Sequence, residues 1–389
     1  MKALRAEAEW APRNGCAPRG RELTERRASA GSLMYRKPVL GIAEVKEPEP
    51  GPDELLVRVR YCGICGSDTH VYESDAEGYI LFSGPAKFPC ILGHEYSGEV
   101  AAVGKEVTGF KKGDIVTAES VLWCGTCMPC RYGMLNQCEN VELLGLTHDG
   151  AFAEYIAVKA KYCWNLNRLH DRFTDEEVLK IGTLVEPIGC AYNGIFVSGG
   201  GFAPGAYAVV YGAGPIGLGA VLLLRAAGAA KIIAVDVVEE RLALAKRMGA
   251  DHVFNAAGTE GTESIEELIM DLTSGWGADL QIEAAGAARR TVPLMEKLYS
   301  RRAKIIYLGR AEALATVELN RLVSGAHSII GSRGHSGYGI FPNIIRLLQE
   351  DRLNGVGEMI TSVFPFSGIA DAFTASTRRV DGKILIAIG

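Results

Sequence analysis

The sequence predicts a two-domain α/β protein, with a β-rich half followed by a doubly wound parallel sheet. Short β-like runs separated by Gly- and Pro-rich turns extend to about Ile156 with little helical periodicity. After Pro204 the pattern changes to apolar strands that alternate with helices, which is typical of a parallel sheet. The length of 389 residues is sufficient for about two to three domains.

Composition and charge exclude several classes of protein. Hydrophobic residues make up 48% of the chain and charged residues 22%, which is ordinary for a soluble globular protein. The net charge of −5 provides no basic field, so we expect neither nucleic acid nor an acidic membrane as a partner. No apolar run reaches the roughly 20 residues of a membrane helix. The acidic N-terminal region lacks the pattern of a targeting peptide, which predicts a cytoplasmic protein.

The first half of the chain is expected to form short strands. The first strand is predicted at Met1–Ala6, and further short runs lie between Leu40 and Val59, around a Pro-rich turn at residues 47–52. Residues 11–36 are rich in Arg, Gly, Pro and Ser. We interpret them as an inserted surface loop, with a basic partner-binding arm as the alternative.

The second half is expected to alternate strands and helices. Further strands are predicted at Tyr207–Tyr211, Lys231–Val235, His252–Phe254, Leu280–Ala284, Lys304–Leu308 and Ser328–Ile330, and helices at Glu239–Met248, Ser264–Leu272 and Thr291–Tyr299. The last stretch, residues 341–389, is expected to pack on the first domain. The expected domains are therefore 1–190 with 336–389, and 191–335.

A dinucleotide-binding motif lies at the start of this second half. Gly212, Gly214 and Gly217 follow a predicted strand and open a predicted helix, which is the context that the Rossmann motif requires. These glycines allow a tight turn, close approach of a pyrophosphate and close helix packing. Asp236 ends the next strand, where its carboxylate can bind the adenosine ribose and repel a 2′-phosphate. NAD is therefore favoured over NADP, and a tightly packed βαβ unit without nucleotide is the alternative.

Four of the ten cysteines form a short cluster, namely Cys124, Cys127, Cys130 and Cys138. In a chain without a secretory pattern, such clustering favours metal ligation over disulfides. Four thiolates with short spacers that contain Gly and Pro match a structural zinc site. An iron–sulfur cluster and four free thiols are the alternatives.

A second group of candidate ligands lies in Cys62-Gly-Ile-Cys-Gly-Ser-Asp68 and in Gly93-His-Glu95. Taken alone, one Cys and one His are more often structural than metal-binding. These two motifs are followed by the four-cysteine cluster, Gly-Ala-Phe-Ala-Glu-Tyr at 150–155, Val-Glu-Pro at 185–187 and Gly-Ala-Gly-Pro-Ile-Gly at 212–217. This ordered series resembles the zinc-containing medium-chain alcohol and polyol dehydrogenases. The resemblance covers the chain apart from the insertion.

The resemblance implies a GroES-like catalytic domain, a Rossmann domain and two zinc sites. It implies that Cys65 and His94 ligate a catalytic zinc, and that Glu95 and Glu186 supply the remaining protein oxygens; which Glu binds directly is left open. Glu95 thus counts among both the metal-binding and the catalytic residues.

The reaction that the resemblance implies is hydride transfer between a hydroxyl-bearing carbon and the nicotinamide. Ser67 matches the family's relay hydroxyl and His70 its relay imidazole, for which a pKa near working pH is suitable. A turn-forming Ser67 and a surface His70 are the alternatives.

Further cofactor contacts also follow from the family pattern. They are expected at the dinucleotide motif, in the helix after Asp236, and at the ends of two later strands, with Ile216, Arg241, Leu308, Ser332 and Arg333 as the candidates. A solvated helix face is the alternative for Arg241.

The expected substrate is a small cyclic polyol. Residues 77–82, 122–124 and 334–342 look most like the branch that oxidises inosose-type cyclitols, with His335 as the expected hydroxyl partner. An acyclic polyol, butanediol or L-threonine dehydrogenase is the alternative. Family members that lost the catalytic zinc, such as quinone reductases, need none of these ligands. A homodimer or homotetramer is expected by analogy with the family.

Overall fold

The computed structural model describes residues 1–257, 264–310 and 314–389, and the chain divides into two compact units. Unit 1 comprises residues 1–186, 362–379 and 384–389, and unit 2 comprises residues 187–361 and 380–383. Among the described residues, no helix combines the length and the apolar character that a bilayer crossing requires.

Unit 1 is built on antiparallel strands. A three-stranded sheet has the order β2-β1-β4, a larger sheet the order β10-β6-β5-β3-β18-β17 with β9 also paired to β3, and β7 pairs with β8. The strand bounds are β1 (Lys2–Trp10), β2 (Tyr35–Glu44), β3 (Glu54–Gly63), β4 (Cys90–Ile91), β5 (Glu95–Val103), β6 (Ile115–Ala118), β7 (Val121–Leu122), β8 (Glu142–Leu143), β9 (Tyr155–Lys159), β10 (Cys163–Asn165), β17 (Ile360–Pro365) and β18 (Lys383–Ala387).

Short helices accompany these strands. They are α1 (Arg21–Glu25), α2 (Gly31–Met34), α3 (Gly66–Tyr72), α4 (Met128–Arg131), α5 (Asp175–Gly182) and α13 (Ile369–Thr377). Helix α6 (Val185–Tyr192) begins with the last two residues of this part of unit 1 and continues in unit 2. The ring centroids of Phe152 and Phe373 lie 5.9 Å apart, which fixes α13 in the core of unit 1. The expected surface loop at 11–36 contains α1 and α2, and its last two residues belong to β2.

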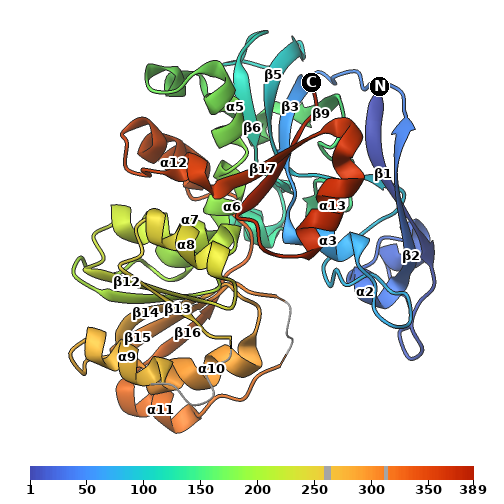
Figure 1. Cartoon of the computed structure of the whole chain (residues 1–389). Coiled ribbons are helices and arrows are strands. Elements are labelled where there is room, and N and C mark those ends of the chain that lie inside the picture. The colour runs from blue at the N-terminus through green and yellow to red at the C-terminus, as the bar shows by residue number, and fades with distance from the viewer. Residues whose placement is uncertain (258–263, 311–313) are drawn as a thin grey trace. The chain divides into compact units, whose positions relative to one another are not determined.

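Unit 2 contains a six-stranded parallel sheet with the order β13-β12-β11-β14-β15-β16. Its strands are β11 (Tyr207–Tyr211), β12 (Lys231–Asp236), β13 (His252–Asn255), β14 (Ala278–Glu283), β15 (Tyr299–Tyr307) and β16 (Ser328–Gly331). Helices α7 (Pro215–Ala226) and α8 (Glu239–Arg247) lie on one face, and α9 (Ile265–Leu272), α10 (Ala288–Lys297) and α11 (Leu319–Gly325) on the other (Figure 1). The doubly wound sheet expected from the sequence is therefore confirmed.

The strand order reverses at β11, which is the first strand of this sheet in the sequence and lies at its centre. Ligands of doubly wound sheets bind at such a switch point, outside the carboxyl ends of the strands. The loop that leaves β11 carries the glycines of the dinucleotide motif. One difference from the sequence-based expectation is β15, which begins at Tyr299, a residue expected to end a helix.

The segment after residue 335 is divided between the two units, whereas we expected all of it in the first domain. Helix α12 (Ile340–Gln349) belongs to unit 2. Its Asn343 donates a 3.0 Å hydrogen bond to the Tyr192 hydroxyl, and its Phe341 ring lies 5.0 Å from that of His335. Its amphipathic pattern therefore serves the core of unit 2, and the chain joins unit 1 only from Ser362 onward.

Candidate active site

The four clustered cysteines lie together in unit 1. The sulfur atoms of Cys124, Cys127, Cys130 and Cys138 all lie within 4.8 Å of one another. The Cys127 and Cys138 sulfur atoms are 3.8 Å apart. Four sulfur atoms held at about 2.3 Å from a tetrahedral zinc would be separated by about 3.8 Å. The geometry therefore fits a zinc ion.

Electrostatics at this cluster also favour a cation. Hydrogen bonds from the Thr126 hydroxyl and from backbone N–H groups lower the pKa of Cys124 to about 5. Burial, together with the neighbouring Cys127 and Cys138 sulfur atoms, raises the pKa of Cys130 to about 12. The Cys124 thiolate thus forms readily, whereas burial and the neighbouring sulfur atoms oppose ionisation of Cys130. A central zinc ion would offset that opposition.

The second ligand group is created by one strand pairing. In the antiparallel pair of β3 and β5, Gly63 lies opposite Glu95. The residues just beyond these strand ends, Cys65 and His94, are thereby brought to the same place. One ligand atom from each of Cys65, His94 and Glu95 lies within 4.8 Å of the others, and His94 and Glu95 are buried. Sulfur, imidazole and carboxylate form a donor set that zinc accepts in catalytic sites.

Asp68 orients two of these ligands. One carboxylate oxygen accepts the Cys65 N–H at 3.0 Å in a capping box at the start of α3. The other lies 3.7 Å from Nδ1 of His94, while Nε2 of His94 lies 3.5 Å from the Ser67 hydroxyl. Burial lowers the pKa of His94, but the charges of Asp68 and Cys65 raise it well above its usual value. This pocket therefore favours positive charge, as a zinc site should.

Glu186 is placed differently from Glu95. It is not part of the group formed by Cys65, His94 and Glu95. Instead, Glu186 Oε1 accepts a 2.8 Å hydrogen bond from the hydroxyl of Ser120, and both side chains are buried. Our sequence reasoning missed Ser120. No local pattern could reveal it, because its partner lies 66 positions further along the chain.

The two candidate relay residues share the short helix α3. Ser67 lies in its first turn, and His70 in its last. Burial and the charge of Arg379 lower the pKa of His70, which Glu73 opposes. His70 is therefore neutral near pH 7, the form that can accept a proton.

The dinucleotide motif has the backbone geometry expected of it. A Cβ atom on Gly217 would lie 1.8 Å from the Gly212 carbonyl oxygen, so only glycine fits there. A Cβ on Gly214 would meet only the Arg241 guanidinium, no nearer than 3.7 Å, which leaves space beside the loop. Such a space next to the start of a helix suits a pyrophosphate.

Asp236 faces this loop from the end of β12. One of its carboxylate oxygens accepts the Ala213 N–H at 2.6 Å, and the other accepts those of Val237 and Val238 at 2.7 and 3.0 Å. These bonds hold the carboxylate beside the glycine loop. Its position is the one that a ribose-binding residue needs.

The remaining cofactor candidates also lie in unit 2. Ile216 is partly buried in the first turn of α7, and Arg241 donates from Nε to the Asp381 carbonyl at 3.1 Å. Beyond the ends of β15 and β16, three candidates adjoin residues 193–198: Leu308 approaches Gly194, the Ser332 hydroxyl lies 3.1 Å from that of Ser198, and the Arg333 carbonyl accepts from Asn193.

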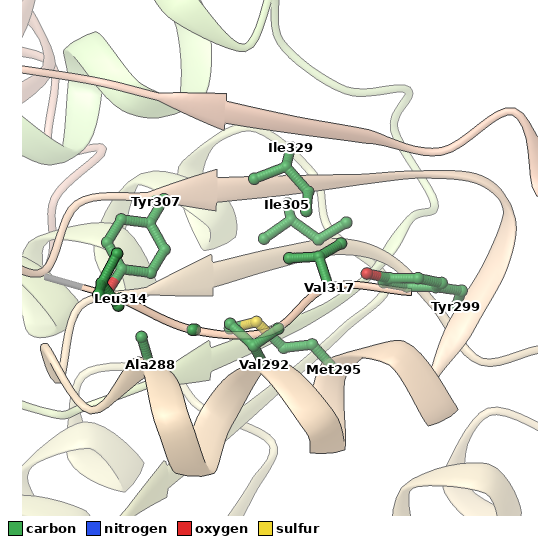
Figure 2. Close-up of a pocket in the computed structure, with 10 residues that line it drawn as sticks. Ala288, Val292, Met295, Tyr299, Ile305, Tyr307, Leu314, Val317 and Ile329 are labelled. Atoms are coloured by element: carbon green, nitrogen blue, oxygen red, sulfur yellow. The ribbon is translucent and has the colours of Figure 1, made fainter. Parts of the chain in front are cut away.

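His335 is more deeply placed than a substrate contact would suggest. Only 1% of its surface is exposed, and it packs on Phe341 and against the backbone of Gly189. A separate hollow of about 190 Å³ in unit 2 is lined almost wholly by apolar side chains from α10, β15, β16 and residues 314–317 (Figure 2). Figure 2 shows only tyrosine hydroxyls as polar groups there, so this hollow does not suit a polyol.

Comparison with known proteins agrees with these two units. A family model described as an alcohol dehydrogenase GroES-like domain matches residues 51–168, and one described as a zinc-binding dehydrogenase matches residues 215–350. Scyllo-inosose 3-dehydrogenase of Thermotoga maritima is 41% identical over 359 residues, with 90% of each chain covered. L-Threonine 3-dehydrogenase of Pyrococcus horikoshii is 32% identical over 361 residues, covering 91% of this chain and 97% of the relative.

A solved structure shares the whole fold. The putative alcohol dehydrogenase from Thermotoga maritima has a TM-score of 0.95 and 37% identity, with both chains fully covered. The 2R,3R-butanediol dehydrogenase of Bacillus subtilis has a TM-score of 0.76 and 27% identity, covering 93% of this chain and 99% of that one. With its paired ligand clusters and its glycine loop in the family's order, the chain belongs to the zinc-binding medium-chain alcohol dehydrogenases and is a dehydrogenase with a GroES-like and a Rossmann-type domain.

Proposed function

We propose that this dehydrogenase is a cytoplasmic enzyme that transfers a hydride between a secondary alcohol of a cyclic polyol, an inosose or another cyclitol, and NAD. The observation that carries the substrate class is the 41% identity to scyllo-inosose 3-dehydrogenase, against 32% to an L-threonine dehydrogenase over a similar length. Thiolate ligands that must stay reduced favour the cytoplasm. The alternative is an acyclic polyol, butanediol or L-threonine as substrate.

The zinc ligands divide into a catalytic and a structural set. The catalytic ion would be held by Cys65, His94 and Glu95. Glu186 would supply an additional oxygen, and its carboxylate accepts a hydrogen bond from Ser120. The four-cysteine cluster would hold the structural ion. When bound, the catalytic zinc polarises the substrate hydroxyl and the nicotinamide accepts the hydride.

The chain's own residues would handle the proton. Ser67, 3.5 Å from His94 Nε2, is placed beside the ligand group, and its hydroxyl can receive the proton of the substrate. His70 lies one turn further along α3 and, with its lowered pKa, can accept that proton and release it to solvent.

NAD is the proposed dinucleotide. Asp236 supplies a carboxylate beside Gly212, Gly214 and Gly217, and no cationic residue directly follows it. Among similar structures, an Escherichia coli dehydrogenase at 30% identity and a TM-score of 0.77 (90% and 96% of the two chains covered) was solved with NADH. One from Sinorhizobium meliloti at 25% identity and a TM-score of 0.76 (93% and 98% covered) was solved with NADP. The Asp236 carboxylate is therefore the feature that favours NAD. Ile216, Arg241, Leu308, Ser332 and Arg333 complete the proposed cofactor contacts.

A homodimer or homotetramer is also proposed. In unit 2, Leu314, which lines the hollow of Figure 2, is 75% exposed, and Leu319 and Val323, one turn apart on α11, are 69% and 81% exposed. Among the described residues, β16 has a strand neighbour on one side only. Exposed apolar side chains and an open sheet edge are both features suited to contact with a second copy of the chain.

A substrate screen tests the proposed function. NAD reduction would be measured with cyclitols, sugar alcohols, 2,3-butanediol and L-threonine, and the highest kcat/KM is expected for a cyclitol. A rigid ring loses less conformational entropy on binding than an open chain does. His335→Ala tests the hydroxyl partner expected from the sequence, which the structure buries against Phe341: a contact with substrate would raise KM or lower kcat for the cyclitol and leave NAD affinity nearly unchanged. If L-threonine or an open-chain diol exceeds every cyclitol, the cyclitol assignment is wrong.

A further inference from the structure

The insertion at residues 11–34, named the brace, is attached to unit 1 through Arg13. The Nε atom of Arg13 donates to the Ser32 carbonyl at 2.9 Å, and Nη1 donates to Glu77 at 2.7 Å. Its Nη2 pairs with Asp75, and the guanidinium lies 3.9 Å from the centre of the Tyr79 ring. Arg13 thus uses three nitrogen atoms and its flat face at once, which only a planar guanidinium can do.

The partners of Arg13 outside the brace belong to one loop, residues 75–82. Asp75 uses its second carboxylate oxygen to accept the backbone N–H groups of Glu77 and Tyr79, at 2.9 and 3.0 Å. The carboxylate therefore connects the turn of the loop to the brace. Tyr79, whose ring Arg13 covers, is itself 8% exposed.

Backbone pairing attaches the brace to the residues that continue this loop. The N–H groups of Ala28, Gly31 and Ser32 donate to the carbonyls of Ala86, Gly84 and Phe82 at 2.8 to 2.9 Å. A Cβ atom on Gly31 would lie only 2.9 Å from the Ile80 side chain. The two segments are therefore in direct contact along their length.

The same loop holds the end of the helix that carries the candidate proton relay. The N–H groups of Leu81 and Phe82 both donate to the carbonyl of His70, at 2.8 and 3.0 Å. The Leu81 N–H also lies 3.2 Å from the Glu73 carbonyl. A change in the position of the loop must therefore change the last turn of α3.

The other part of the brace is attached beside the cysteine cluster. Arg21 pairs with Glu142 at 2.8 Å and Arg27 pairs with it at 3.1 Å, while Arg27 also donates to the Val141 carbonyl. Glu142 lies in β8, opposite Leu122 of β7, which is two residues before the first cysteine of the cluster. The brace thus has one attachment near the structural site and one at the loop beside α3.

We propose that the brace orders loop 75–82 and that Arg13 is the positioning residue through which it fixes His70. This inference rests on the proposed function only for the role of His70. The loop cannot shift while Arg13 binds Asp75, Glu77 and Tyr79, so the carbonyl end of α3 keeps one arrangement. The brace thereby makes α3 and loop 75–82 more rigid than a short helix followed by an exposed loop would be alone.

Amide hydrogen exchange of the zinc-loaded protein tests the ordering directly. Arg13→Ala should accelerate exchange at Leu81 and Phe82 by about tenfold, because these amides are bonded to His70. Exchange in Arg13→Lys, which keeps the charge but not the planar guanidinium, should be faster than in the parent and slower than in Arg13→Ala. Arg5→Ala is the matched control, since Arg5 is a surface arginine of β1 that pairs with the exposed Glu7 and should leave the loop unchanged.

Kinetics separate positioning from a purely structural role. Arg13→Ala should lower kcat and shift the acid limb of the pH profile of kcat. Zinc content and KM for NAD should stay within about twofold of the parent values. Unchanged exchange at Leu81 and Phe82 would overturn the proposal, as would faster exchange with an unaltered pH profile. Because exchange needs no substrate, failure of every cyclitol in the screen would overturn the proposed function and leave this test standing.

Discussion

The hydroxyl of Ser120 donates a 2.8 Å hydrogen bond to Glu186, and both residues are buried in unit 1. Ser120 is held by its own backbone, because its carbonyl accepts the Leu144 N–H at 2.9 Å. The preceding Glu119 accepts from the indole N–H groups of Trp123 and Trp164. The Glu186 carboxylate is therefore held by a rigid segment, whereas Glu95 is placed with Cys65 and His94.

This relationship predicts different effects for the two glutamates. Glu95→Ala should weaken zinc binding at the catalytic site more than Glu186→Ala does. Ser120→Ala should lower the zinc affinity of that site by about tenfold. Zinc retention against a competing chelator measures this, with the structural ion as the internal reference. Ser120→Thr, which keeps the hydroxyl, is the control. Equal losses for Glu95→Ala and Glu186→Ala would contradict the assignment.

The two ligand clusters predict two zinc ions per chain with different roles. Cys65→Ser should abolish turnover and leave the melting temperature nearly unchanged. Cys127→Ser should lower Tm by roughly 5 °C or more, because structural zinc contributes directly to folding. Elemental analysis and thermal melts of chelator-free protein measure both. Normal activity in Cys65→Ser would show that the catalytic assignment is wrong.

Local patterns were sufficient to predict most of the fold. The alternation of apolar strands with helices indicated the parallel sheet, and the tight cysteine spacing indicated the cluster at 124–138. Both depend on residues close in sequence. The α12 segment was misplaced because an amphipathic helix shows that it has a buried face and not which core buries it.

The contacts that sequence reasoning could not reach join distant segments. Ser120 and Glu186, or Arg13 and Asp75, are isolated polar residues of common type in the sequence. Their significance depends on the antiparallel pairings of unit 1, which no periodicity specifies. The insertion was likewise interpreted as a surface loop. In the sequence its arginines cannot be distinguished from solvent-exposed ones, because their acidic partners lie far along the chain.

Cofactor preference should depend on Asp236. Asp236→Ser removes the ribose hydrogen bonds and the acceptor of the Ala213 N–H, so KM for NAD should rise by about 10- to 100-fold and discrimination against NADP should fall. Asp236→Asn is the matched control, because its remaining oxygen can still accept from Ala213 without the charge. Steady-state kinetics with both cofactors measure the ratio. If Asp236→Asn discriminates as the parent does, charge repulsion is not the cause.

The acid limb of the rate should report His70. Burial and the charge of Arg379 lower the pKa of His70. The neutral imidazole that accepts the proton therefore persists at pH values below the usual pKa of histidine, and kcat falls at still lower pH because the imidazole becomes protonated. Arg379→Ala removes a cation and frees Glu73, its partner at 2.7 Å; both changes raise that pKa. The acid limb of kcat should therefore move to higher pH, whereas it should stay in place in Arg378→Ala. His70→Gln should lose the limb and lower kcat. A limb that is unmoved in Arg379→Ala and persists in His70→Gln would remove His70 from the proton path.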